Sequence, residues 1–397
     1  MMRLEDACEL IVDCPHSTAR DEGKGFPLIR TPNIGRGRFL LENVHRVSES
    51  VYNKRNARAV PKDDDIILAR EAPAGNVAII KNGVKMCLGQ RTVLLRPNKE
   101  VVNPDFLTYF LLAPEQQYGL LGTANGATVA HVNIPTIRNL KIKLPPLKTQ
   151  ERIGKILSAY DDLIENNQRQ IKLLEEAAQR LYKEWFVDLR FPGHENTKIT
   201  DGIPEGWRMA VLSEIASVNK ESISKQYPYD YVDYIDIGAV SKGQINSVTR
   251  LSTKDAPGRA KRIAFDGDVL WGMVRPNLKS YALVFHPKET SVFSTGFAIL
   301  HAEKVPFSFL YCHVTQDEFV SYLINCTNGA AYPAVKPSHF ENAVLLVPTD
   351  MVLSKFHSLV GQMFRQAEIL EQKNQQAIEA RDRLLPKLMS GEIEVEK

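Results

Sequence analysis

The sequence is poor in cysteine and has no long apolar run. Its five cysteines are odd in number, scattered along the chain and without a CxxC pair, which argues against a disulfide framework and against a zinc site. No apolar stretch reaches the length of a membrane span, and residues 1–10 carry acids where a secretory signal would have an apolar segment. We therefore expect a cytoplasmic protein with reduced thiols and no membrane partner.

Catalytic signatures are missing as well. The chain has no GxxxxGK(S/T) loop, no HExxH, no GxSxG, no GxGxxG after an expected strand, and no Asn-Pro-Pro-aromatic motif of amino-methyltransferases. The acidic run Asp63-Asp64-Asp65 is a candidate metal cluster, but its counterpart Asp266-Gly267-Asp268 in the second half favours a turn that opens a strand. These absences favour a binding protein over an enzyme, with no catalytic residue, metal or cofactor of its own.

Length and composition describe a globular protein of two or three domains. The chain has 397 residues, of which 44% are hydrophobic and 24% are charged. The net charge of +3 comes from the first 146 residues, where Lys and Arg outnumber Asp and Glu. This region could therefore meet a polyanion, although so small a charge does not by itself indicate a nucleic-acid-binding protein.

The second half of the chain repeats the first. The matched pairs, all with one constant separation, are Asn125 with Asn328, Val132 with Val335, Asn139 with Asn342 and Pro145 with Pro348. Both halves also have β-like stretches, at 88–95 and 293–300, followed by expected helices at 104–112 and 306–314 that begin near a proline. A constant separation over several landmarks indicates an internal duplication.

Two long helices carry heptad seams, in which apolar positions recur at alternating steps of four and three residues. The first seam is Ile153, Leu157, Tyr160, Ile164, Asn167, Ile171, Leu174, Ala178, Leu181 and Trp185. The second seam is Phe356, Val360, Met363, Ala367, Leu370, Asn374, Ala377, Arg381, Leu384 and Leu388. Pro386 is expected to end or kink the second helix, which would place Leu388 beyond regular pairing.

Each seam contains one asparagine, and this predicts how the helices pair. A buried asparagine without a partner is costly, so two that meet select one register. In the fully overlapped antiparallel register the facing pairs are Asn167 with Asn374, Tyr160 with Arg381, Leu174 with Ala367, and Trp185 with Phe356. Antiparallel pairing would relate the two halves by a pseudo-two-fold arrangement.

In their order along the chain, these features resemble the specificity (S) subunit of type I restriction–modification systems. The segments that carry the resemblance are Leu144-Pro145-Pro146-Leu147 with Gln150 and Ile153, Glu184-Trp185-Phe186, Ile203-Pro204-Glu205-Gly206-Trp207, and Arg381 to Gly391. The resemblance covers essentially the whole chain. It implies an α+β fold, in which two similar α/β target-recognition domains are joined by two long helices that form an antiparallel coiled coil.

The resemblance also implies a function in DNA recognition without a catalytic centre. Each target-recognition domain would read one half of a bipartite site on double-stranded DNA, and the helices would set the distance between the halves. The implied partners are two methyltransferase subunits, which use S-adenosylmethionine to methylate adenine, and restriction/translocase subunits. The expected boundaries are 1–146 and 194–349 for the domains, and 147–193 and 350–397 for the spacer helices.

Candidate DNA contacts are polar side chains on the turns that both halves share. Arg and Asn have the forked geometry that pairs with guanine or adenine edges, whereas Lys more often contacts phosphate. The candidates are Arg30, Arg36, Arg38, Arg58, Arg70, Asn125, Thr128 and His131 in the first half, and Lys242, Lys261, Arg275, Asn277, Lys279, Tyr332 and Lys336 in the second. At each position an ordinary solvated surface residue is the alternative. Asn167 and Asn374 are the candidates for coiled-coil register.

Two other functions stay open. A scaffold with two modules for binding other proteins would show no steeply salt-dependent affinity for DNA. An enzyme with degenerate motifs, such as a nuclease or a methyltransferase, would act on DNA in the presence of S-adenosylmethionine without a partner.

Overall fold

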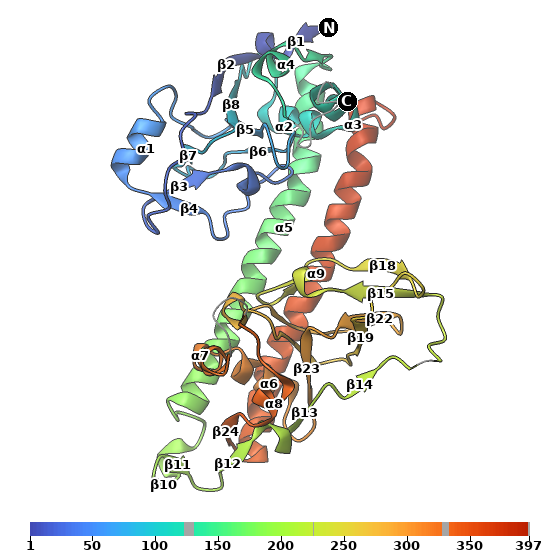
Figure 1. Ribbon diagram of the computed structural model, residues 1–397. Coiled ribbons are helices and arrows are strands. Elements are labelled where there is room, and N and C mark those ends of the chain that lie inside the picture. The colour runs from blue at the N-terminus through green and yellow to red at the C-terminus, as the bar shows by residue number, and fades with distance from the viewer. Residues whose placement is uncertain (123–130, 225, 328–332, 396–397) are drawn as a thin grey trace. The chain divides into compact units, whose positions relative to one another are not determined.

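The chain folds into two compact units. A computed structural model describes residues 1–122, 131–224, 226–327 and 333–395. Unit 1 consists of Met1–Asn167 and Gln372–Lys397, and unit 2 of Gln168–Glu371. Two long helices, α5 (Leu147–Tyr182) and α9 (Asp350–Ser390), each contribute one part to each unit (Figure 1). Within the described residues, no helix combines the length and the apolar character that a membrane span requires.

Unit 1 has two main sheets. Its other elements are β1 (Met2–Arg3), β2 (Cys8–Asp13), β3 (Phe26–Ile29), β4 (His45–Val47), α1 (Glu49–Arg55), β5 (Ile66–Ala69), β6 (Val77–Ile79), β7 (Cys87–Leu88), β8 (Thr92–Pro97), α2 (Pro104–Leu112), α3 (Pro114–Leu121), α4 (Ile134–Asn139) and β9 (Lys141–Ile142). The sheet orders are β2-β8-β5-β6 and β4-β3-β7, and β1 pairs with β9. Strand β3 runs antiparallel to β4 and parallel to β7.

Strand β5 lies at the centre of unit 1, and all four of its residues are buried. Successive side chains of a strand point to opposite faces of the sheet. Ile66 and Leu68 accordingly join one core cluster, which contains Phe106 of α2. Ile67 and Ala69 join a second cluster on the other face. The unbroken apolar run is therefore explained by packing on both faces.

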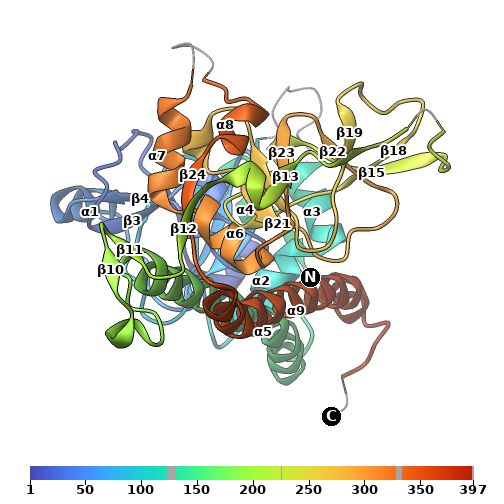
Figure 2. The same cartoon turned by 90° about the horizontal axis from the view of Figure 1, so that it is seen from below.

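Unit 2 repeats this plan with more strands. Its elements are β10 (Ile199–Thr200), β11 (Ile203–Pro204), β12 (Arg208–Val211), β13 (Ala216–Val218), β14 (Glu221–Ser222), β15 (Tyr231–Ile235), β16 (Val240–Ser241), β17 (Gln244–Ile245), β18 (Thr249–Ser252), β19 (Ala260–Ile263), β20 (Val269–Gly272), β21 (Tyr281–Leu283), β22 (Ser291–Ser294), β23 (Phe297–Ala302), α6 (Phe307–Val314), α7 (Asp317–Asn325), α8 (Pro337–Glu341) and β24 (Val344–Val347). Figure 2 shows β15, β18, β19 and β22 together at one edge of unit 2, away from α7 and β24.

The strand order confirms the duplication. The four-stranded sheet β13-β23-β20-β21 has the order of β2-β8-β5-β6, and the pair β12-β24 corresponds to β1-β9. In both units a parallel pair, β3-β7 or β15-β22, is flanked by an antiparallel strand, β4 or β18. Unit 2 extends this second sheet to five strands with β14 and β19 and adds the hairpin β16-β17.

In unit 1 the parts of α5 and α9 pack antiparallel. Asn167 Nδ2 donates to Asn374 Oδ1 over 2.9 Å, and the two residues are only 3% and 2% exposed. Ile153 and Leu157, at the other end of this part of α5, share a core cluster with Leu388. The expected pairing of Asn167 with Asn374 is therefore present.

The expectation that Pro386 ends α9 is wrong. The helix does not end at Pro386 but continues to Ser390. Burial of Leu385 and Leu388, each 4% exposed, in the core of unit 1 offsets the hydrogen bond that the proline removes. The partner of Arg381 is Asp161, the neighbour of Tyr160, because a buried guanidinium requires an opposite charge.

In unit 2 the other parts of the two helices meet through apolar seam positions. Leu174 packs in one cluster with Ala367, together with Ile171 and Leu370. A π-helical turn, Lys183–Val187, follows α5 and brings Trp185 against Phe356, with 5.8 Å between the ring centroids. These contacts have the antiparallel register that the seams predict.

The buried asparagine pair leads to opposite predictions for a single and a double substitution. Asn167→Leu alone should lower the free energy of unfolding by about 1–3 kcal/mol, because it leaves the buried Asn374 amide without its donor. The double variant Asn167→Leu/Asn374→Leu should be at least as stable as the native chain, because neither amide remains buried. Calorimetry on both variants measures this, and a single variant that is more stable than the double variant would contradict it.

Candidate nucleic-acid interface

The end of β5 gathers charged side chains in unit 1. Arg70 Nη1 lies 3.1 Å from both carboxylate oxygens of Asp13, and Arg70 Nε donates to the Val132 carbonyl over 2.8 Å. Its Nη2 lies 2.9 Å from His131 Nε2, and His131 Nδ1 lies 2.6 Å from Glu71 Oε1. The structure therefore brings the candidates Arg70 and His131 together. Arg70 is only 8% exposed, and these contacts make it a buried clamp between two loops.

A small hollow next to this cluster presents two more arginines. Its volume is about 180 Å³, and Arg30, Gln90 and Arg91 line it together with Thr18 and Thr31. Arg30 Nε is buried, and within the described residues it has no hydrogen-bond partner. The Arg91 side chain is 62% exposed, while Glu71 holds its guanidinium at 2.6 Å. This wall therefore combines one buried donor that has no partner with two side chains, Gln90 and Arg91, that their own contacts hold in place.

Gln90 and Arg91 were not among the sequence candidates. They lie between β7 and β8, in a stretch expected to be a single strand. The turn has Arg91 at a φ of +62° and separates two strands that belong to different sheets. The glycine at position 89 was a signal for this turn, because isolated glycines in a strand pattern often mark such breaks.

The remaining candidates of unit 1 have different surroundings. Arg36 and Arg58 are exposed, and Arg58 Nη1 donates to the carbonyl of Asp13, the partner of Arg70, over 3.3 Å. Arg38 is turned toward α5, where its Nη2 donates to Asp162 Oδ1 over 2.7 Å, and its side chain is 13% exposed. Asn125 and Thr128 lie outside the described residues. Arg38 is thus engaged in holding the unit together.

In unit 2 the loop after β20 collects several candidates. Arg275, Asn277 and Lys279 lie in or beside the 3-10 turn Pro276–Leu278. The Arg275 amide donates to the Pro333 carbonyl over 2.8 Å, which brings this turn beside the segment that leads to Lys336. Asn277 and Lys336 are exposed.

The other second-half candidates differ in their surroundings. Lys279 Nζ donates to Asp317 Oδ1 over 2.6 Å, and this ion pair lowers the pKa of Asp317. Lys242 is exposed in the turn between β16 and β17, and Lys261 is exposed on β19, away from the loop after β20. Tyr332 lies outside the described residues.

The loop clusters of the two units occupy equivalent places in the fold. The Val132 amide donates to the Arg70 carbonyl in unit 1, and the Val335 amide donates to the Met273 carbonyl in unit 2, each over 2.9 Å. The backbone arrangement is thus the same, while the side chains differ: unit 1 has Arg70 where unit 2 has Met273. Each unit presents its own set of polar groups on a shared frame.

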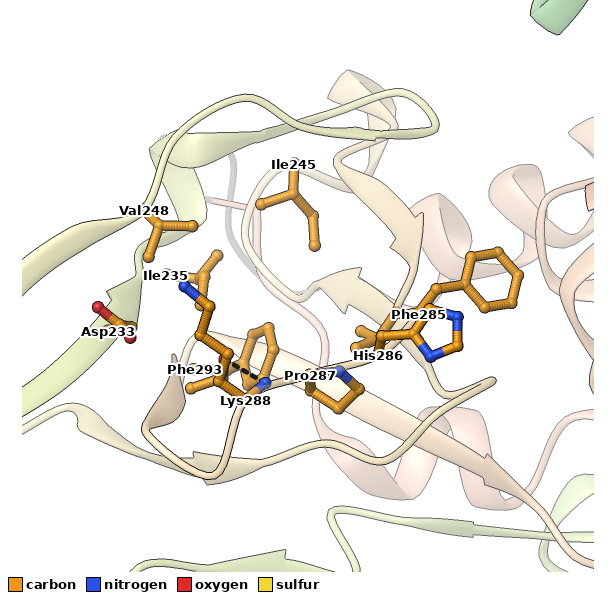
Figure 3. Close-up of a pocket in the computed structure, with 11 residues that line it drawn as sticks. Asp233, Ile235, Ile245, Val248, Phe285, His286, Pro287, Lys288 and Phe293 are labelled. Atoms are coloured by element: carbon orange, nitrogen blue, oxygen red, sulfur yellow. Dashed lines mark hydrogen bonds between the residues drawn. The ribbon is translucent and has the colours of Figure 1, made fainter. Parts of the chain in front are cut away.

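A larger hollow, of about 300 Å³, lies in unit 2 (Figure 3). Ile235, Ile245 and Phe293 give it an apolar wall, and Lys288 extends toward the strand that carries Asp233. No sequence candidate for DNA contact lines it. Its mainly apolar lining makes it unlike the polar loop clusters.

The fold and the loop clusters define a protein of two similar modules. Comparisons with known proteins then show which family the chain resembles. Residues 1–176 match the family described as the type I restriction modification DNA specificity domain. The MjaIX specificity subunit of a type I restriction enzyme from Methanocaldococcus jannaschii is 27% identical over 376 residues, which are 90% of this chain and 84% of that protein. The HindI specificity subunit from Haemophilus influenzae is 20% identical over 435 residues, covering 92% of this chain and 94% of that protein.

A solved structure has the same fold. The crystal structure of a type I restriction–modification S subunit from M. genitalium aligns with a TM-score of 0.54 at 14% identity, over 98% of this chain and 95% of that one. Together with the sequence matches, this confirms the resemblance to type I specificity subunits and the expected fold class. The matches indicate a DNA specificity subunit and do not favour the scaffold alternative.

Substitutions of the buried Arg70 and of the exposed Arg91 should have different effects on the free energy of unfolding. Arg70→Met should cost about 3 kcal/mol in the free energy of unfolding, because it removes the buried guanidinium that contacts the Asp13 carboxylate and the Val132 carbonyl. Arg91→Ala should cost less than about 1 kcal/mol, because its ion pair is largely exposed to solvent. Urea unfolding measures both, and equal costs would contradict the assignment of Arg70 as the clamp.

Proposed function

We propose that this chain reads a bipartite site on double-stranded DNA, with unit 1 contacting one half of the site and unit 2 the other. The observation that supports this is the shared frame that carries different polar side chains in the two units. Hydrogen bonds to base edges specify sequence, whereas the scaffold only positions the groups that make them. Two different sets on one frame suit two different half-sites.

The proposed readers are polar side chains that gather at the small hollow of unit 1 and on the loops around Pro276–Leu278 of unit 2. In unit 1 these are Arg30, Gln90 and Arg91, which share the hollow beside β8. In unit 2 they are Asn277 and Lys336, which are exposed on neighbouring loops. Two former candidates, Arg38 and Arg70, are assigned instead to holding the loops in place.

The proposed partners follow from the family. Two methyltransferase subunits, which would carry the S-adenosylmethionine, and restriction/translocase subunits would assemble with this non-catalytic chain in the cytoplasm. Exposed apolar side chains outside the seams support docking on the helices: Ile156 and Leu163 are 37% and 47% exposed in unit 1, and Leu173 and Ile369 are 63% and 45% exposed in unit 2. We keep 1–146 and 194–349 as the proposed recognition domains, and 147–193 and 350–397 as the spacer helices.

Methylation sequencing tests the proposal. The chain is expressed with its neighbouring methyltransferase subunit in cells that lack other adenine methylation, and the DNA is sequenced for methyladenine. We expect one two-part motif with methyladenine in each half. An assembled complex that creates no motif would contradict DNA recognition, and methyl transfer by this chain alone would contradict its non-catalytic role.

Two substitutions in unit 2 distinguish base contact from phosphate contact. Asn277→Ala should cost about 1–3 kcal/mol of binding free energy and relax one position of the motif. Lys336→Ala should weaken binding to all sequences alike and reduce the dependence of affinity on salt concentration. Fluorescence anisotropy of the complex on matched and single-mismatch duplexes measures both effects. If Asn277→Ala left every mismatch penalty unchanged, the residue would not be a base reader.

A further inference from the structure

A buried charged network ties the strand-and-helix part of unit 1 to both long helices. We call residues 1–146 module 1. Tyr109 of α2 donates from its hydroxyl to Asp161 Oδ2 of α5 over 2.6 Å. Arg381 of α9 donates to the other oxygen, Asp161 Oδ1. Tyr109 is 1%, Asp161 3% and Arg381 8% exposed, so three elements converge on one carboxylate away from water.

The network shifts the protonation equilibria of its members in the directions expected for a buried ion pair. Burial, and then the Asp161 carboxylate, raise the pKa of Tyr109, so its hydroxyl keeps its proton and remains a donor. Burial by itself would lower the pKa of Arg381, but the contact with Asp161 outweighs it and raises that pKa. The network therefore holds one arrangement of charges and donors.

A glycine turn connects the network to the sheet of module 1. Arg381 Nη1 lies 3.4 Å from the Arg36 carbonyl. The next residue, Gly37, has a φ of +100°, and a Cβ at this position would collide with the Asp161 carboxylate. The Gly37 amide donates to the Val77 carbonyl over 2.8 Å, and its own carbonyl accepts from the Ile79 amide over 3.2 Å. The turn is thus fixed to β6, and through the sheet to the candidate DNA contacts.

Unit 2 has apolar side chains at the two helix positions that correspond to Asp161 and Arg381. Phe364 of α9 has the place that Asp161 has in α5, one residue after the matched seam positions Met363 and Tyr160. Tyr311 of α6 packs on Phe364, with 5.1 Å between the ring centroids. At the repeat position of Arg381 unit 2 has Ala178, which is fully buried. These two helix positions can therefore be filled by apolar side chains, while burial, and then the Glu175 carboxylate, raise the pKa of Tyr311.

This comparison separates stability from positioning. Replacing a buried ion pair by well-packed apolar residues is often neutral or stabilising, so stability alone does not explain the charges in unit 1. Apolar contact is non-directional, whereas a fully satisfied polar network specifies one geometry. The network of Tyr109, Asp161 and Arg381 therefore serves mainly to fix the orientation of module 1.

We propose that Tyr109, Asp161 and Arg381 are positioning residues, which fix the orientation of module 1 on the paired helices and so restrict the spacing between half-sites that the complex accepts. This inference rests on the proposed function. The three residues act through the Gly37 turn and contact no DNA themselves.

Methylation sequencing of variant complexes tests the effect on spacing. Tyr109→Phe removes one hydroxyl from the network, and Asp161→Phe/Arg381→Ala replaces its two charged helix residues by the apolar residues that unit 2 has at the corresponding positions. In both variants we expect methylated sites whose half-sites lie one base pair closer or farther apart to increase about tenfold relative to the native complex, because loss of preorganisation relaxes the geometry of two linked modules.

A measurement without DNA follows module 1 directly. Spin labels are placed at Lys54→Cys on α1 and Glu379→Cys on α9, both exposed and both in unit 1, in a chain where the partly exposed Cys8 and Cys326 are serine. We expect a narrow distribution of label distances in the native chain and a broader one in each network variant. Thermal unfolding of the same samples shows that the variants are folded.

The outcomes are distinguishable. If the native complex creates no bipartite motif, the proposed function fails. If the native motif appears and the folded variants keep both its single spacing and the narrow distance distribution, the positioning role is wrong. Broader distances together with relaxed spacing support it.

Discussion

The hydrogen bond between Asn167 and Asn374 is the contact on which the helix pairing of unit 1 depends. Both amides are buried, so any register that separated them would leave two polar groups without partners. Apolar seam positions do not discriminate in this way, because leucine or isoleucine packs acceptably after a shift by one heptad. With the register fixed, Ile153 and Leu157 reach Leu388 in the core of unit 1.

A second constraint arises from the duplication. Both units use the same strand order and the same backbone hydrogen bond after the central strand, at Val132 in one and Val335 in the other. A fixed backbone allows the loop side chains to vary at little cost to the fold, since exposed loop positions contribute little to stability. The proposed recognition of two different DNA sequences would then require different loop side chains on the same backbone architecture.

The sequence was sufficient to predict the periodic features. Spacing along the chain was enough to predict the seams, the asparagine pair, the duplication and the helix at Pro104–Leu112, because it does not depend on tertiary contacts. Pro386 was misjudged because the burial of Leu385 and Leu388, a tertiary effect, outweighs a local rule. The run at 88–95 was expected to be one strand, and the turn that splits it places Gln90 and Arg91 beside Arg30.

The individual DNA contacts were harder to predict, because the role of an arginine depends on what surrounds it. Arg38, Arg70 and Arg91 look alike in the sequence. Only the fold shows that Arg38 and Arg70 are turned inward to carboxylates, while most of the Arg91 side chain is exposed. Pairing with residues far along the chain, such as Asp162 for Arg38, leaves no local signal.

Separate reading by the two units is tested most directly by the methylation motif of the complex that carries Gln90→Ala/Arg91→Ala. Both side chains lie in unit 1, and neither is part of its core. We predict relaxed sequence preference in one half of the motif, with the other half and the number of base pairs between them unchanged. Relaxed preference in both halves, or an unaltered motif, would contradict the assignment of one half-site to each unit.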